Sequence, residues 1–397
     1  MFESLNQYRE VEKHHNVDPH YGFLPYHVID DVIVPDSFLT HFEIFRNLHK
    51  YLSAKCLPSN IMQLPIFGAA GLDAALAECD SAQLSLLFSV FSVLSNSYIV
   101  SIGEKEQPRL PRQLAVPLIA ISDVLEINPI FCLWSTLCAM RQDSLVRPSM
   151  FSGYKMAFSF TGTRTEDCFF KINGIIAIKL TELLDIIYII NSVGVHEGCR
   201  SGQAPKIILP GDVQVVNIQL LKLYGIIEFI NKIALALLQE MDAPVFFHGL
   251  RPYLRGYSAY AGGVFFDGIG KAFYFEGASA GQDPYMILLK SFFRMSYPAH
   301  MSDYRHRLSS SVRRCHRRFI EIIQQNCVVT ELATNNLEIE ANYERCKAAL
   351  RRFFRIHKAY IERFIVSPAT KAGLRRDELT GVGGTPIDQI LKLHEYL

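Results

Sequence analysis

His357 lies in the apolar segment LRRFFRIHKAYIERFI, with Phe353 one helical turn before it and Ile361 one turn after it. A histidine on an apolar helix face is most often a core residue with a satisfied hydrogen bond, and periodicity alone favours that interpretation. The sharper alternative is a ligand of a porphyrin iron. Heme needs one neutral imidazole on a rigid helix, apolar walls and cations for its propionates, and the arginines around His357 could supply those cations.

Arg251 also has unusual neighbours, because it stands in the segment APVFFHGLRPYLRGY between two phenylalanines and the pair Tyr253 and Leu254. An arginine in such apolar company is seldom there for solubility. It could form a structural ion pair, or its guanidinium could bind a substrate carboxylate bidentately in a mostly apolar pocket.

Familiar catalytic motifs do not supply a function. The chain has no P-loop and no HExxH, and GASAG at 277–281 lacks the flanking strand and the immediate helix of a hydrolase elbow. The basic run RHRLSSSVRRCHRR at 305–318 favours a solvated helix face over a nucleic-acid surface, because charge on one helix has no matching positive surface elsewhere.

The composition is that of a globular protein with a large core: 397 residues, 49% hydrophobic and 20% charged. A net charge of +1 excludes a global field that would attract nucleic acid or an anionic membrane. The 9 cysteines show no CxxC and no regular spacing, which indicates free thiols in a reducing compartment. Together with a polar N-terminus, this predicts a cytoplasmic protein.

Helical periodicity dominates the chain and predicts helices over 84–100, 216–241 and 339–365, the last one closed by Pro368. Short strands are expected at 32–34 and 273–275.

The apolar stretch 174–190 carries Lys179, Glu182 and Asp185, which favours a core helix with one solvated stripe over a membrane span. Glycine-rich loops at 255–284 and 367–386 are candidates for functional segments.

Several segments, in order along nearly the whole chain, together resemble the indoleamine 2,3-dioxygenase family. They are YGFLP (21–25), LPRQLAVP (110–117), FSFTGT with FF (158–163 and 169–170), FFHGLRPYLRGY (246–257), EGASAGQ (276–282), HRRF with CKAALRRFFRIH (316–319 and 346–357) and GVGGTP (381–386). Each motif alone is weak, and their order makes the resemblance specific.

The resemblance implies an all-α fold. A small, mainly helical domain at residues 1–157 would cap the distal side, and a large all-helical domain at 158–397 would bind heme b. It also implies a set of site residues. His357 would be the proximal ligand of the heme iron, and Arg251 would bind the carboxylate of an indole amino acid. The remaining positions would line the pocket: Phe246 and Leu254 against the indole, Phe169, Phe170 and Leu133 on the distal side, Asn173 at the distal polar position, Ser279 and Ala280 at the heme edge, and Gly383 and Thr385 in a mobile lid.

This sequence departs from the family pattern at four of its positions. Asn173 stands where serine is usual, and Leu133 where a tyrosine aligns. Phe354 replaces an arginine often found three residues before the proximal histidine. Val382 replaces the threonine that contacts the substrate ammonium. Loss of that polar contact would weaken tryptophan binding by about 1–3 kcal/mol, or admit another indole.

The implied activity is a heme-dependent dioxygenation. O2 would be inserted across the indole C2=C3 bond of L-tryptophan or a related indole, giving N-formylkynurenine, and an electron donor would keep the iron ferrous. Two alternatives stay open: other heme chemistry on an indole amino acid, and a heme- or indole-binding protein without turnover. Product analysis distinguishes other heme chemistry from dioxygenation. Ligand binding without oxygen consumption would indicate a binding protein without turnover.

Overall fold

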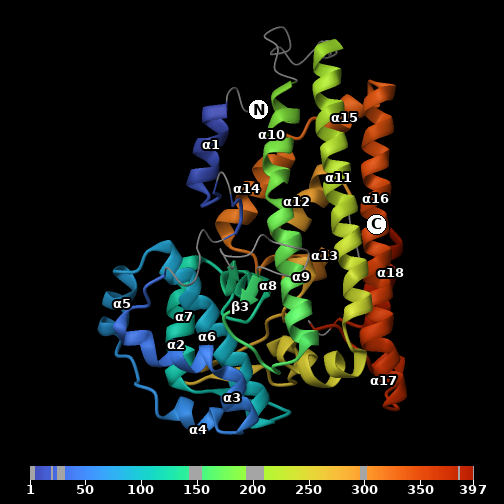
Figure 1. Cartoon of the computed structure of the whole chain (residues 1–397). Helices are drawn as coiled ribbons and strands as arrows, with labels where there is room; N and C mark the ends of the chain where they lie inside the picture. The colour runs from blue at the N-terminus through green and yellow to red at the C-terminus, as the bar shows by residue number, and fades with distance from the viewer. Residues whose placement is uncertain are drawn as a thin grey trace.

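The computed structural model describes residues 5–18, 21–24, 32–142, 154–193, 210–295, 302–382 and 385–396. Within these ranges nearly all regular structure is helical, and the expected all-α class is confirmed. Figure 1 shows long helices standing side by side in the C-terminal part and a group of shorter helices formed by the N-terminal part.

The long helices form the bundle that carries the site. They are α9 (Arg164–Leu180), α10 (Glu182–Val193), α11 (Pro210–Glu240) and α16 (Leu337–Ile361). Helices α11 and α16 run side by side (Figure 1) and are joined along their length. The Asn231 amide donates to the Ala349 carbonyl at 3.1 Å, and the Cys346 thiol donates to the Leu220 carbonyl at 3.2 Å.

The predicted helix over 339–365 is confirmed, but it does not end at Pro368. Asn336 caps α16 by accepting hydrogen bonds from the next turn. After Ile361 the chain continues through a π-helical turn, Glu362–Val366, into α17 (Ser367–Lys371). Pro368 stands in the first turn of α17, directly after the π-helical turn, and the helix continues past it although proline has no N–H to donate. Part of the expected loop at 367–386 is therefore helical.

The stretch 174–190 forms two helices instead of one. Helices α9 and α10 meet at Thr181, and Lys179 and Glu182 form an ion pair of 2.5 Å across the junction. Asp185 is exposed, as the solvated stripe predicts, and it pairs with Arg9 at 3.0 Å. The charges that make a membrane span improbable thus lie on the surface of the bundle.

The N-terminal helices surround one buried helix, α6 (Ser81–Ile102). Among the described residues α6 is long and apolar enough to cross a membrane, but 78% of its most apolar window is buried inside the protein, which is the pattern of a core helix. Its neighbours are α2 (Leu39–Arg46), α3 (Leu48–Ser53), α4 (Leu57–Met62), α7 (Arg112–Leu125) and α8 (Leu133–Cys138). Helix α5 (Ala69–Ala77) packs against α7. Ser89 and Ser92 on α6 hydrogen-bond Ser135 and so fix the position of α8.

Strands are few and short. β1 (Arg109–Leu110) pairs in parallel with β4 (Val264–Phe266), which pairs antiparallel with β5 (Lys271–Phe273), and β2 (Met140–Gln142) pairs with β3 (Tyr154–Met156). The predicted strand at 273–275 overlaps β5 only at Phe273. The predicted strand at 32–34 is wrong: these residues are irregular, with Val34 buried against the core and Ile33 exposed.

Shorter helices complete the C-terminal part: α12 (Pro284–Phe292), α13 (Ser302–Ser309), α14 (Arg314–Gln325), α15 (Val329–Thr334) and α18 (Ile387–Tyr396). The basic run at 305–318 is split between α13 and α14, and only part of it is solvated. Arg313 between them is buried, with its guanidinium 5.4 Å from the centroid of the Trp134 ring.

The division into domains at 157/158 stays a prediction. The boundary directly follows β3, and residues 143–153 before it lie outside the described ranges. Helix α1 (Leu5–His14), the first described element, lies beside α10 (Figure 1), where the Tyr8 hydroxyl donates to the Leu184 carbonyl at 3.3 Å.

Candidate functional site

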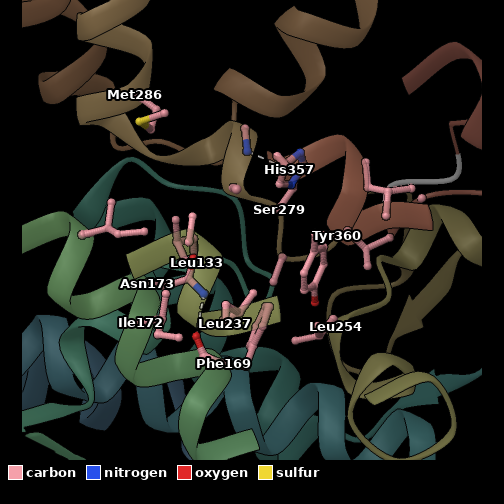
Figure 2. Close-up of a pocket in the computed structure, with 18 of the residues that line it drawn as sticks. Leu133, Phe169, Ile172, Asn173, Leu237, Leu254, Ser279, Met286, His357 and Tyr360 are labelled. Atoms are coloured by element: carbon pink, nitrogen blue, oxygen red, sulfur yellow. Dashed lines mark hydrogen bonds between the residues drawn. The ribbon is translucent and has the colours of Figure 1, made fainter. Parts of the chain in front are cut away.

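An apolar cavity of about 210 Å³ lies between α9, α11, α16 and the segment before α12. Figure 2 shows its labelled side chains converging from these separate elements. It brings together nearly all of the residues singled out from the sequence: Leu133, Phe169, Phe170, Asn173, Phe246, Leu254, Ser279, Ala280, Val382 and His357. Segments more than two hundred residues apart in the chain therefore build one site.

His357 is half-buried on α16 and lines this cavity. Its ring lies nearly parallel to that of Tyr360, with an interplanar angle of 12° and 6.1 Å between centroids. Figure 2 shows both side chains leaving the same helix, with Ser279 beside His357. A rigid helix thus presents an imidazole to an apolar space.

Helix α9 supplies the aromatic wall, and a buried carboxylate fixes where it begins. Glu166 accepts hydrogen bonds from the backbone N–H of Phe160 at 2.6 Å and of Thr161 at 2.7 Å. The segment FSFTGT is therefore folded around the first turn of α9. Two turns along, Phe169 and Asn173 face the cavity, and the Asn173 amide donates to the Phe169 carbonyl at 2.7 Å (Figure 2).

Gln282 holds the loop that carries Ser279. Its side-chain amide donates to the Gly277 carbonyl at 2.9 Å, and its side-chain oxygen accepts from the Ser279 N–H at 3.1 Å. The same oxygen accepts from the Leu133 N–H at 3.4 Å, which connects this loop to the start of α8. Gln282 thus sets the spacing between two walls of the cavity.

Asp283 then starts α12, accepting from the Tyr285 N–H at 2.8 Å. Burial raises the pKa of this carboxyl to about 6. The helix that it caps presents Met286 and Lys290 to the cavity.

Arg251 lies beside the cavity and is not among the side chains that line it. One terminal nitrogen of its guanidinium donates to the Thr380 carbonyl at 2.6 Å, and the group packs 5.2 Å from the Phe247 ring centroid. Burial lowers the pKa of Arg251 to about 10, so it stays cationic at neutral pH. No carboxylate of the described residues is paired with it, so the alternative of a structural ion pair finds no support there.

The C-terminal loop closes this side of the cavity. Thr380 and Pro386 form a backbone bridge at its base, and Gly381 and Val382 line the cavity. Thr385 is buried. Gly383 lies outside the described residues.

Tyr360 is the main lining residue that sequence reasoning missed. It packs against Phe246 in a T-shaped arrangement, with 5.5 Å between centroids. Burial raises its pKa well above the usual value for a tyrosine, so its hydroxyl remains a donor. The available signal was its place three residues after His357, on the same helix face.

Three buried polar atoms around this end of the site have no hydrogen-bond partner among the described residues. They are Arg251 Nε, the Tyr360 hydroxyl and the Thr385 hydroxyl. An unpaired buried polar group is costly, so such a cluster beside a cavity indicates a bound polar group as its partner.

The donor atoms that face the cavity are few, and His357 supplies the one imidazole among the described lining residues. Within the described ranges, no three His, Cys, Asp or Glu side chains come together as a metal cluster. One imidazole facing an apolar cavity is instead the donor set that heme uses.

Comparison with known proteins decides the family. The sequence pattern of the indoleamine 2,3-dioxygenase family matches residues 11–393. The chain belongs to the indoleamine 2,3-dioxygenase family. It is 26% identical to the indoleamine 2,3-dioxygenase acdA of Aspergillus candidus over 77% of each chain. It is 25% identical to qulI of Penicillium citrinum, over 94% of this chain and 84% of the relative. It is 21% identical to indoleamine 2,3-dioxygenase 1 of Mus musculus, over 95% of this chain and 92% of the relative.

Membership makes this chain an oxidoreductase of the dioxygenase type, in a family of heme-dependent enzymes that act on indoles. The resemblance read from its motifs is thereby confirmed.

Proposed function

We propose that this indoleamine 2,3-dioxygenase family member uses heme b to insert both atoms of O2 across the C2=C3 bond of L-tryptophan or a related indole. The product would be N-formylkynurenine or its analogue, as a first step of tryptophan catabolism through the kynurenine pathway. The observation that carries this proposal is the cavity itself, where His357 on α16 and the Phe169–Asn173 face of α9 line one apolar space.

The residues present fit a heme with His357 as its axial ligand. Bound heme would supply the iron that activates O2. Ser279 and Ala280 have small side chains, which allow a flat ligand to approach the loop backbone closely. Phe169 and Phe170 would limit the space on the other side and keep it dry.

The substrate would be held by its two ends. Phe246 and Leu254 offer apolar surface for the indole. Arg251 would bind the carboxylate through Nε, which has no partner among the described residues. A bidentate clamp also needs the terminal nitrogen that now donates to the Thr380 carbonyl. Carboxylate binding would therefore loosen the base of the 381–385 loop, which acts as the lid.

The cavity is poorly equipped for acid–base chemistry, which supports a reaction driven by the cofactor. No Asp or Glu is among the described residues that line it. The protein's contribution would be orientation, exclusion of water and the carboxylate clamp.

The test is turnover of heme-loaded protein with L-tryptophan, O2 and an electron donor that keeps the iron ferrous. N-formylkynurenine with both oxygen atoms from 18O2 is the expected product. A different oxidised indole would indicate other heme chemistry in the same superfamily. Binding of heme and tryptophan without oxygen consumption would leave a binding protein and refute the dioxygenase.

Arg251→Ala should raise KM for L-tryptophan by about 10- to 100-fold, because charge-assisted hydrogen bonds contribute roughly 1.5–3 kcal/mol. The heme absorption spectrum should not change. The matched control is Arg255→Ala, four residues on and exposed. Equal kinetics for the two variants would remove Arg251 from the site.

We also propose a cytoplasmic location. The described cysteines, among them the buried Cys132, Cys138 and Cys346, are all free thiols, which suits a reducing compartment. Subcellular fractionation with an antibody to the native protein tests this, and enrichment in an oxidising compartment would refute it.

A further inference from the structure

The Tyr360 hydroxyl has no hydrogen-bond partner among the described residues, although the side chain is buried and lines the cavity. The other described lining side chains that carry a hydroxyl or an amide are Thr136, Asn173 and Ser279, and each hydrogen-bonds to nearby backbone. A buried hydroxyl without a partner is costly, because it has lost its contact with water and gained nothing in exchange. Of these described side chains, Tyr360 is the one that a ligand has still to satisfy.

Tyr360 lies at the end of the cavity where Arg251 lies. Burial raises the pKa of the Tyr360 hydroxyl, and the charge of the nearby Arg251 guanidinium lowers it by a smaller amount. Figure 2 shows the Tyr360 side chain directed towards Leu254, which follows Arg251 by three residues. Arg251 Nε is also buried without a partner among the described residues. Two unpaired donors, one O–H and one N–H, are therefore present at this end of the site.

Aromatic neighbours fix the position of the Tyr360 hydroxyl. Its ring centroid lies 4.7 Å from that of Phe364, 5.5 Å from that of Phe246 and 6.5 Å from that of Phe169. Phe246 and Phe169 belong to the walls that would enclose the indole. The hydroxyl is therefore held beside the space proposed for the indole, where the polar end of the substrate would lie.

An anion suits this position better than a cation. A tyrosine hydroxyl can donate to a carboxylate or accept from an ammonium, and an amino acid carries both groups. The Arg251 guanidinium stays charged at neutral pH, so it repels a second cation nearby and attracts an anion. A carboxylate also has two oxygens, one for the Arg251 Nε–H and one for the Tyr360 O–H. The two unpaired donors thus match a single ligand group.

We propose that the Tyr360 hydroxyl donates a hydrogen bond to the substrate carboxylate beside Arg251, and that this contact selects indoles with a carboxylate over indole amines that lack one. The inference rests on the proposed function, because it takes an indole in this cavity as the substrate. It adds a specificity-determining residue on α16, the helix that carries His357. One element would then place both the cofactor ligand and the polar end of the substrate.

The test measures the binding of three probes by isothermal titration: L-tryptophan, indole-3-propionate, which lacks the ammonium, and tryptamine, which lacks the carboxylate. Heme-loaded protein is used in its ferrous carbon monoxide form, in which no amine can bind the iron and no turnover occurs. Wild-type protein should bind each of the two carboxylates about tenfold more tightly than tryptamine. Tyr360→Phe should weaken the binding of both carboxylates about fivefold to tenfold and leave that of tryptamine unchanged.

The control is Tyr274→Phe, which removes an exposed hydroxyl and should leave all three affinities unchanged. Circular dichroism checks that both variants are folded. If folded Tyr360→Phe binds the two carboxylates as wild type does, or loses affinity for tryptamine as well, the inference is overturned, while turnover of L-tryptophan still supports the proposed function. If wild-type protein binds none of the three probes saturably, the proposed function fails and this inference falls with it.

Discussion

At the scale of residues, the site is defined by groups that lack partners. Tyr360 and Tyr257 both bury a hydroxyl without a hydrogen-bond partner among the described residues. Only Tyr360 lines the cavity. The Tyr360 hydroxyl can therefore hydrogen-bond to a ligand in the cavity, while the Tyr257 hydroxyl is part of the packed interior.

Tyr360→Phe should stabilise the free protein and weaken ligand binding. Removing an unsatisfied buried hydroxyl relieves a desolvation cost of roughly 1–3 kcal/mol. Loss of a donor to the substrate should raise the dissociation constant for L-tryptophan about fivefold to tenfold. Isothermal titration of L-tryptophan and chemical denaturation measure the two effects.

Tyr257→Phe is the matched control, with a similar gain in stability and unchanged tryptophan affinity. If Tyr360→Phe also leaves the affinity unchanged, its hydroxyl has no part in substrate binding.

Most residues of the site could be predicted from the sequence, because aligned motifs fix which positions converge. The direction of a side chain could not be predicted. Arg251 was placed in the substrate pocket, yet in the structure it contacts the Thr380 carbonyl beside it. Tyr360 and Lys290 were missed because apolar periodicity does not mark a hydroxyl or an ammonium that faces a cavity.

At the scale of elements, two glycines determine how closely the walls of the site approach each other. A Cβ on Gly277 would lie 2.2 Å from the Leu254 carbonyl oxygen, and one on Gly256 would lie 2.3 Å from the Gly277 nitrogen. The Ala278 N–H donates to the Leu254 carbonyl at 3.1 Å across this contact. The loops that carry Leu254 and Ser279 can be adjacent only without these side chains.

Gly277→Ala should therefore push the two loops apart. We expect a loss of about 1–3 kcal/mol in the free energy of unfolding and weaker heme binding, since the obstruction is backbone. The control is Gly225→Ala, at an exposed position of α11 where an added Cβ meets nothing within 4 Å. The free energy of unfolding of Gly225→Ala should rise by about 0.5–1 kcal/mol, because alanine is the better helix former. Equal stability changes in the two variants would contradict the close approach.

Long helices were predicted well because their apolar period extends over many turns, as for α6 and α11. Their ends were predicted less well. The junction at Thr181 and the continuation past Pro368 depend on local capping and on neighbours, which a hydrophobic pattern does not contain. The irregular segment at 32–34 shows the same limit, because only Val34 of its apolar residues is buried and no strand partner pairs with it among the described residues.

At the scale of the whole molecule, two buried histidines link stability to pH. His41 lies among Phe38, Phe67 and Phe91, and burial lowers its pKa to about 4. Burial also lowers the pKa of His316, to about 3. Both are neutral when folded and gain a proton near pH 6.5 when unfolded, so stability is complete above pH 6.5 and falls as the pH drops below it.

His41→Leu should reduce this acid sensitivity. Each of the two histidines should lower the free energy of unfolding by about 2 kcal/mol at pH 5 relative to pH 8, because a shift of one pKa unit corresponds to about 1.36 kcal/mol. Buried Asp283, whose pKa is raised, acts in the opposite direction in both proteins and cancels from the comparison. Urea unfolding at pH 8 and pH 5 measures the difference, and an identical loss in wild type and variant would contradict this account.

The proposed heme site concerns the whole molecule, because helices from distant parts of the chain line the one cavity that would hold the cofactor. The most direct test is a heme titration of wild-type protein, His357→Ala and His306→Ala, the last being exposed on α13. We expect a Soret band that saturates at one heme per chain in wild type and in His306→Ala, with altered ligation or lost uptake in His357→Ala alone. Absence of specific uptake by wild type, or a His357→Ala spectrum equal to wild type, would contradict the heme site and the dioxygenase built on it.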